Sequence, residues 1–561
     1  MRSKKLGVAI GLAVFMSCGC TVIPVGGPTT VEEAPDADPM RKQFVRMVAF
    51  PPLPGWGPDA VVRGLQAAMA AYPDDPDTLK KYLTPRAQAT WKAAGPITVL
   101  DKAAFKEVDG RVVLVGNQIA RIDNDDRFVP VTDKVTKEFT LKKEANGWRV
   151  DTLEDGLVLT AADVDRAYRS TKLFYLNGSP RPDGLVSDPV HLRLNPKENF
   201  AETIVERLIK GPSSALRGAV SSALPEHTTV AAVSAADEKV VVNLKGAIDS
   251  ASTDTRALSA QLRSSLGDMA NGRTIEVQLD GEPFYGSDPL TISPDASLDW
   301  FPGTSPAYYT SNGEVHAMGG DGGPGNAVHG PAGQHNGYSD LAIAKEGSRV
   351  AGRLTGDGIY VADVALNAQW QRAIQGADLT APSWHRDGSL WTYDRKAGAV
   401  LRRDLETPGL PTRVAAPDLD ERDVTDLRVA RDGVRVAVGI GVHEVRVGAI
   451  TGGSTAMMLG NFQPVLTVSE GDQIRDIAWK DGEHLLVMVS GKAGQIVKEI
   501  NVGDGETTTL TSDPRLKTIA ALNDRILAGT EEGGEILEFK DQQGWISKIK
   551  ESAQAPLFPL G

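Results

Sequence analysis

The sequence predicts a chain of several domains, mixed α and β in its first half and all-β in its second half. With 561 residues the chain is too long for one hydrophobic core. Helical and strand periodicities alternate as far as about residue 284. From residue 291 onward, short β-prone runs recur around tight turns, and the 58 glycines and 34 prolines suit many short strands.

The N-terminus has the pattern of a signal peptide, which we assign to residues 1–19. Arg2, Lys4 and Lys5 form a positive region, followed by an apolar run of about eleven residues, 6–16. A membrane-spanning helix needs about 20 apolar residues, so this run is too short to span a bilayer. We therefore expect the mature protein to lie outside the cytoplasm.

The segment SCGC at residues 17–20 resembles a bacterial lipobox. In such a segment the cysteine thiol becomes a thioether to diacylglycerol, cleavage occurs just before it, and the new amine receives a fatty acid such as palmitate. Cys20 follows small residues, although Ser17 stands where an aliphatic residue is usual. Cys18 is the alternative, but Phe15 and Met16 before it are less suitable; a plain cleaved signal peptide is the third possibility. We predict lipid attachment at Cys20, with residues 20–39 as a flexible Pro- and Gly-rich tether.

Residues 40–170 predict an α+β domain. An amphipathic helix is expected at Asp59–Tyr72, and strands at Val112–Val115 and Lys137–Lys143. Asn146-Gly147 is a hairpin signal, with the returning strand beginning at Trp148. Helices followed by a curved sheet are similar to an NTF2-like or cystatin-like fold; such folds host enzymes and non-enzymes alike and so indicate little about function.

Residues 171–290 predict a smaller α/β domain. A strand at Lys172–Leu176 precedes a helix in which Phe200, Ile204 and Leu208 recur every four residues, with Asn195 as the expected cap. Two strands, a second helix and a last strand follow. The order β-α-β-β-α-β predicts two helices on one side of a small sheet.

Residues 291–561 predict a β-propeller of about six blades. Six tight turns separate β-prone runs, and their second residues are 34, 41, 45, 49 and 42 positions apart, a period typical of four-stranded blades. Trp384, Trp391 and Trp479 lie beside these turns, and we expect them to pack between blades rather than to bind a ligand. The turns are Asn312-Gly313, Glu346-Gly347, Asp387-Gly388, Asp432-Gly433, Asp481-Gly482 and Asn523-Asp524.

Composition and motifs favour a binding or regulatory protein over an enzyme. The 73 acidic residues outnumber the 60 basic ones, giving a net charge of −13, which disfavours nucleic-acid binding. His329 and His335 share a Gly-rich loop without nearby carboxylates, so we expect a flexible insertion rather than a metal site. Asp123, Asp125 and Asp126 cluster with two arginines, and we interpret them as a solvated turn. We assign no catalytic residue, no metal and no cofactor.

These parts, in this order, resemble the LpqB lipoproteins of actinobacteria. The segment CGCTVIPVGGP (18–28) is similar to the start of that family, and LIKGP (208–212), ALPEHTTV (223–230) and KVVVNL (239–244) resemble a GerMN domain. The resemblance implies a lipid-anchored protein on the extracytoplasmic side of the cell membrane. It also implies an interaction with the extracellular domain of the MtrB sensor kinase, which would tune the Mtr two-component system and affect envelope integrity and cell division.

Two other functions stay open from the sequence. The protein could bind cell-wall glycan or peptide, although an aromatic content of 6% is low for sugar stacking. A hydrolase or lyase acting on the wall is a weaker alternative, because no motif supports it while propellers do host such chemistry.

Overall fold

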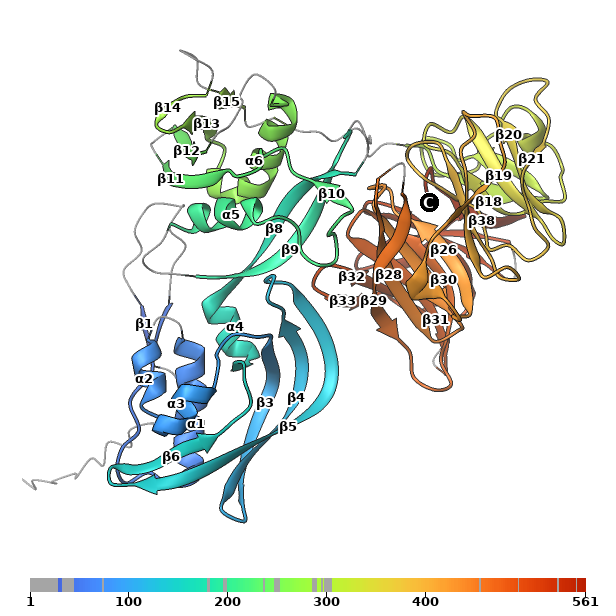
Figure 1. Ribbon diagram of the computed structural model, residues 1–561. Helices are drawn as coiled ribbons and strands as arrows, with labels where there is room; N and C mark the ends of the chain where they lie inside the picture. Colours follow the sequence, from blue (N-terminus) through green and yellow to red (C-terminus); the bar gives the residue numbers. More distant parts are fainter. Residues whose placement is uncertain are drawn as a thin grey trace, which may run out of the picture.

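The computed structural model describes residues 29–32, 45–72, 75–178, 182–194, 199–235, 238–246, 253–284, 290–293, 296, 305–453, 456–492, 494–531, 534–550 and 552–561. Figure 1 shows an N-terminal domain in blue, a middle domain in green and a propeller in yellow to red. The predicted signal peptide and Cys20 lie outside the described residues. Among the helices of the described part, none combines the length and apolar character that crossing a bilayer requires.

The N-terminal domain packs short helices against one long curved sheet. Leu65 of the first helix and Tyr82 meet Leu100 and Leu114 of the sheet in a core where all four are almost fully buried. The predicted helix and the Asn146-Gly147 hairpin are confirmed. The helices are α1 (Pro58–Ala71), α2 (Pro76–Lys80), α3 (Pro85–Thr90) and α4 (Ala161–Ala167), and the sheet has the order β6 (Gly147–Thr152), β5 (Phe128–Glu144), β4 (Arg111–Ile122), β3 (Ile97–Val108), β7 (Val158–Thr160).

One segment of the expected tether is a strand. β1 (Thr29–Glu32) pairs antiparallel with β2 (Val45–Val48), so a fully flexible tether at residues 20–39 is wrong for these four residues. The sequence TTVE contains three β-branched residues, which favour extended backbone.

The middle domain has two sheets, with its two long helices between them. Helices α5 (Phe200–Ile209) and α6 (Thr255–Ala270) contact strands of both sheets, so the single small sheet that we expected is wrong. The expected cap Asn195 lies outside the described residues, and the side chain of Asn199 caps α5. One sheet has the order β10 (Val220–Ser221), β8 (Tyr168–Asn177), β9 (Leu185–Arg193); the other joins β11 (Thr229–Ala235), β12 (Lys239–Lys245), β13 (Thr274–Leu279) and β14 (Glu282–Pro283), with β15 (Leu290–Ile292) also on β13.

The propeller has six sheets in its described residues, which confirms the predicted architecture. Its innermost strands β18, β22, β26, β30, β34 and β38 contact one another in a closed ring. Five blades have four strands each: β18 (Ser339–Ile343), β19 (Arg349–Leu354), β20 (Gly358–Asp363), β21 (Gln371–Gln375); β22 (Ser383–Trp384), β23 (Leu390–Asp394), β24 (Ala399–Arg403), β25 (Thr412–Val414); β26 (Val424–Val429), β27 (Arg435–Ile440), β28 (Glu444–Thr451), β29 (Met458–Thr467); β30 (Gln473–Trp479), β31 (His484–Gly491), β32 (Gly494–Asn501), β33 (Thr507–Thr509); β34 (Leu516–Leu522), β35 (Arg525–Thr530), β36 (Ile536–Lys540), β37 (Gly544–Ile549).

The closing blade combines the two ends of the propeller segment. Strand β38 (Ala553–Leu557) is its innermost strand and pairs with β16 (Tyr308–Ser311), which pairs in turn with β17 (Glu314–Ala317). The Leu560 N–H donates to the Ile343 carbonyl of the next blade at 3.0 Å. Asn312-Gly313 therefore joins the second and third strands of its blade, whereas the other five predicted turns join first and second strands.

The tryptophans pack between blades, as predicted. Trp384 and Trp479 are each 1% exposed and donate their indole N–H to a carbonyl of the preceding blade, of Ala342 and Arg428 respectively. Trp391 is fully buried in a cluster shared with the blade that follows.

Candidate functional site

Three domains meet at one junction, and the middle domain touches both of its neighbours there. Figure 1 shows strands β8 and β9 extending from the middle domain toward the N-terminal sheet and the propeller. The propeller contributes the face that carries its first-to-second-strand turns. Several charged residues of this junction are buried, among them Arg127, Asp188 and Arg435, so its chemistry follows from how each charge is satisfied.

The turn between β4 and β5 joins the N-terminal domain to the middle domain. Arg207 on α5, whose side chain is 5% exposed, donates to the Asp126 carboxylate at 2.8 Å and to the Asp125 carbonyl at 2.6 Å. The Ser214 N–H donates to the Asp125 carboxylate at 2.5 Å. The interpretation of this acidic cluster as a solvated turn is therefore wrong, because the middle domain covers it.

Burial and hydrogen bonding shift the pKa values of the two aspartates in this turn in opposite directions. Burial would raise the pKa of Asp125, but hydrogen bonds from Ser214 outweigh burial and lower it. For Asp126 burial dominates and raises the pKa, although Arg207 opposes the shift. Phe128 stacks on His191 of β9 at 4.5 Å between ring centroids, and burial lowers the pKa of His191. Both domains therefore contribute aromatic as well as charged groups to this contact.

Two buried arginines of the propeller hold the middle domain. Arg435 donates to the Asp432 carboxylate at 2.8 Å, to the Gly482 carbonyl at 2.9 Å, and to the Ser187 carbonyl of β9. Arg386 donates to the Asp183 carboxylate of the middle domain at 2.9 Å. Because both guanidinium groups are buried, leaving either of them without these partners would be strongly unfavourable, which holds the two domains together.

A small apolar contact surrounds these polar contacts. Val186, Leu216 and Ala219 of the middle domain pack against Val434 and Ala449 of the propeller. The backbones also approach closely, because a side chain at Gly503 would overlap the ring of Pro189, and one at Gly505 would overlap Pro130 of the N-terminal domain. The propeller thus touches both other domains, and the three are packed as one body.

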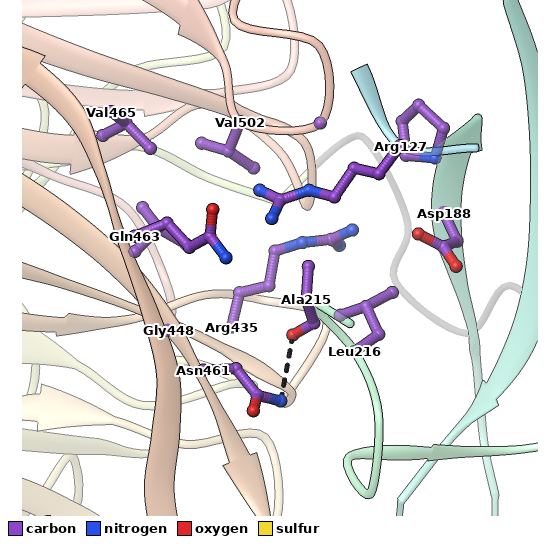
Figure 2. Close-up of a pocket in the computed structure, with 13 residues that line it drawn as sticks. Arg127, Asp188, Ala215, Leu216, Arg435, Gly448, Asn461, Gln463, Val465 and Val502 are labelled. Atoms are coloured by element: carbon purple, nitrogen blue, oxygen red, sulfur yellow. Dashed lines mark hydrogen bonds between the residues drawn. The ribbon is translucent and has the colours of Figure 1, made fainter. Parts of the chain in front are cut away.

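A cavity of about 30 Å³ lies at the centre of the junction (Figure 2). Arg127 enters it from the N-terminal domain, Asp188 lies at its middle-domain wall, and Arg435 and Gln463 come from the propeller. Arg127 is 7% exposed, and its Nη1 has no hydrogen-bond partner among the described residues. Burial lowers the pKa of Arg127 more than Asp188, Asp123 and Asp125 raise it. The guanidinium charge is therefore incompletely compensated by the protein.

A larger cleft of about 540 Å³ separates the middle domain from one propeller turn. On its propeller wall His385 contacts the Asp387 carboxylate at 2.7 Å, and Arg402 donates to it at 3.0 Å. Burial would raise the pKa of Asp387, but the hydrogen bonds from His385 and Ser389 hold it well below its usual range. Ser389 is 1% exposed and donates its hydroxyl proton to Asp387. The histidine and serine both bind the aspartate, an arrangement that orients the turn and does not activate the hydroxyl.

The Gly-rich loop is attached to the closing blade. His335 Nδ1 lies 2.6 Å from the Asn312 carbonyl, whereas His329 is exposed. Within the described residues no group of three or more His, Cys, Asp or Glu side chains is arranged to hold a metal ion.

Sequence reasoning missed the residues that matter most at the junction. Arg127, Asp188, Arg207 and Arg435 lie in three different domains, and nothing in the local sequence brings them together. The local sequence gave one signal, the high density of charged residues at 121–127, and this cluster was interpreted as a solvated turn.

Comparison with known proteins matches each domain in turn. Residues 51–165 match the N-terminal domain of lipoprotein LpqB, residues 172–285 match Germane, described as sporulation and spore germination, and residues 318–559 match the LpqB β-propeller domain. The chain belongs to the LpqB lipoprotein family. Lipoprotein LpqB of Thermobifida fusca is 28% identical over 100% of this chain and 99% of its own length, and that of Streptomyces avermitilis is 27% identical over 100% and 98%.

The solved β-propeller domain of Myceliophteria thermophila Cps50 (Swd1) is 15% identical to this chain. It covers 40% of this chain and 76% of its own, with a TM-score of 0.30.

Each of the three matched domains contributes residues to the cavity at the junction. Arg127 lies in the LpqB N-terminal domain, Asp188 in the Germane domain and Arg435 in the LpqB propeller. In this chain the cavity is therefore formed by all three matched domains together.

Proposed function

We propose that this protein is an accessory regulator of a sensor kinase, held by lipid at the extracytoplasmic face of the cell membrane. Membership of the LpqB lipoprotein family supports the anchor, and the resemblance of residues 17–20 to a lipobox favours Cys20 as its position. The partner that we propose is the extracellular domain of the MtrB sensor kinase, with effects on envelope integrity and cell division. The protein acts by binding and has no catalytic activity of its own.

The packing of the three domains carries this proposal. A binding surface that is preorganised loses less conformational freedom when it binds a receptor. Here the buried arginines Arg207 and Arg386, paired with the half-exposed Asp126 and Asp183, connect the N-terminal domain and the propeller to the same middle domain. A partner that contacts the propeller is therefore positioned relative to the N-terminal domain, which follows the anchor in the chain.

Calorimetric titration tests the partner. We expect residues 40–561 to bind the purified extracellular domain of MtrB, and we expect Arg207→Ala, which removes the contact between two domains, to weaken this binding. Arg111→Ala is the control, because Arg111 forms an exposed ion pair with Glu138 within one sheet. Absence of heat at high micromolar concentrations of both proteins would reject a direct contact.

Fatty-acid labelling tests the anchor. Cys20→Ala should release the protein from the membrane fraction and abolish incorporation of labelled palmitate, whereas Cys18→Ala should retain both. The reverse pattern would move the anchor to Cys18.

The large cleft favours a second candidate, a protein that binds cell-wall peptide or glycan. Its volume of about 540 Å³ and the polar side chains of His385, Asp387 and Arg402 suit a polar ligand. Retention on purified peptidoglycan that is lost in Arg402→Gln would support this candidate. Equal elution of both proteins would reject it.

A further inference from the structure

The central cavity contains a charged donor without an acceptor. Arg127 Nη1 is buried and has no partner among the described residues, although a buried guanidinium N–H without an acceptor is strongly unfavourable. The cavity volume of about 30 Å³ exceeds the roughly 10–15 Å³ that one water-sized occupant needs. The cavity therefore has space for a water-sized occupant, and the Arg127 Nη1 group can donate a hydrogen bond to it.

The carboxylates of Asp188, which lines the cavity, and of Asp432 are already engaged, whereas Oδ1 of Asp125 in the Arg127 turn is buried without a hydrogen-bond partner among the described residues. Asp188 accepts from the Ser213 N–H at 2.6 Å and from the Ser213 hydroxyl at 2.7 Å, one bond to each oxygen. Asp432 pairs with Arg435 at 2.8 Å and also accepts from the backbone N–H groups of Val434 and Arg435. Neither carboxylate forms an ion pair with Arg127 within the described residues. The charges of Asp188, Asp123 and Asp125 raise the pKa of Arg127 but do not offset its burial, so its charge is compensated only in part.

The remaining walls suit a small, weakly hydrated anion. Figure 2 shows the guanidinium of Arg127 and the side-chain amide of Gln463 facing the same space, with Val465 and Val502 on the propeller side. Ala215 and Leu216 complete an apolar wall. Guanidinium and amide N–H groups donate to an anion, and the apolar walls exclude the water that would otherwise compete for these donors.

We propose that the cavity between the three domains is a binding site for a monovalent halide ion, chloride under physiological conditions, held by Arg127 and Gln463. A water molecule would accept the hydrogen bond but add no negative charge, so the charge of Arg127 would stay incompletely compensated, whereas chloride accepts the bond and compensates the charge. The ion contacts residues from two domains and lies against the third. Its binding therefore stabilises the docked arrangement by mass action.

Thermal unfolding of the full chain in detergent tests the linkage. In sodium chloride, compared with sodium gluconate at equal ionic strength, the first unfolding midpoint should rise by about 2 °C for each tenfold increase in chloride above its dissociation constant. Arg127→Gln and Gln463→Leu should abolish this difference. Arg121→Gln should retain it, because Arg121 is a more exposed arginine of the same hairpin that pairs with Asp123.

Bromide locates the ion without relying on stability. Crystals of the full chain grown in sodium bromide should show an anomalous peak within hydrogen-bond distance of Arg127 Nη1, and crystals of Gln463→Leu should show at least a severalfold weaker peak. An unfolding midpoint that is equal in chloride and gluconate, together with no anomalous peak in the cavity, would overturn the proposal and assign the cavity to water.

Discussion

Asp476 places a carboxyl group at the axis of the propeller. It lies on the innermost strand β30, and its oxygens accept backbone N–H groups of Ile477 and, in the next blade, Ile519 at 2.9 and 2.8 Å. Burial raises the pKa of Asp476 to about 7; the charge of Arg428 opposes this shift and that of Asp426 adds to it. The folded propeller therefore keeps a proton on Asp476 that the unfolded chain releases near pH 4.

This raised pKa predicts how stability depends on pH. The contribution of Asp476 is complete below about pH 4 and is lost as the pH rises through 7, at up to about 1.4 kcal/mol per pH unit. Asp476→Asn removes this dependence, so its free energy of unfolding relative to wild type should rise by about 2 kcal/mol between pH 5 and pH 8. Urea unfolding at both pH values measures the difference. An equal gap between variant and wild type at the two pH values would contradict the raised pKa.

Gly503 tests the close approach of the propeller and the middle domain. A Cβ at this position would lie 2.8 Å from Cδ of Pro189, and nearer still to Cγ, so alanine must push the β32–β33 loop away from β9. Gly503→Ala should destabilise the junction by about 1–3 kcal/mol, as overpacking generally does. The shift in the unfolding midpoint measures this effect. Gly337→Ala, where nothing lies within 4 Å, is the control and should leave the midpoint unchanged.

Residues whose role is local could be predicted from the sequence, and residues whose role is tertiary could not. Asp387-Gly388 is a turn wherever it occurs between β-prone runs, because its backbone preference is intrinsic. Arg127 is different. A charged residue in a hairpin turn is normally solvated, and Arg127 is buried only because the middle domain and the propeller pack against this turn.

Helices and strands show the same difference: those with a local sequence signal were predicted, and those that depend on tertiary contacts were not. Helix α1 and the five first-to-second-strand turns have strong periodic or turn signals and were found. Strand β9 was missed because Asp188 and Pro189 interrupt its apolar pattern, and both residues serve the interface. The second sheet of the middle domain was missed for the same reason, since β9 is one of its strands.

Strand β38 closes the ring, and Arg431 holds the segment that follows it. Arg431 donates to the carbonyls of Pro559, Trp479 and Ala521 at 3.2, 2.6 and 2.7 Å, so one side chain connects three places on the ring. Phe558 is 1% exposed in the core of the closing blade. The segment from β38 to residue 560 therefore combines backbone pairing, apolar burial and charged hydrogen bonds.

Weakening this segment should open the propeller at one place. Phe558→Ala should cost about 3–5 kcal/mol, the usual effect of deleting a buried phenylalanine. Hydrogen exchange should then accelerate first at the amides of β16 and β18, which border the closing strand, and last at β27 on the far side of the ring. Uniform acceleration over all six blades would contradict closure by this segment and would indicate that the ring unfolds as one unit.

At the scale of the whole molecule, the N-terminal domain depends on a few charged contacts for its position. Arg207 supplies two of them, to Asp126 and Asp125, and truncating it leaves the Asp126 carboxylate partly buried without its cation. The chain connection from α4 into β8, the Phe128–His191 stack, and the bonds from the Ser214 and His191 N–H groups to Asp125 and Asp126 remain. We therefore expect Arg207→Ala to release the domain from its docked position without unfolding it.

Small-angle X-ray scattering separates release from unfolding. The radius of gyration of Arg207→Ala should increase while its circular dichroism spectrum stays that of wild type, and Arg111→Ala should change neither. The N-terminal domain lies between the predicted anchor and the rest of the chain, so its release lets the propeller move relative to the membrane. Scattering identical to wild type would show that the aromatic stack and the β9 contacts hold the domain without the arginine, and the charged contacts would then set only its fine position.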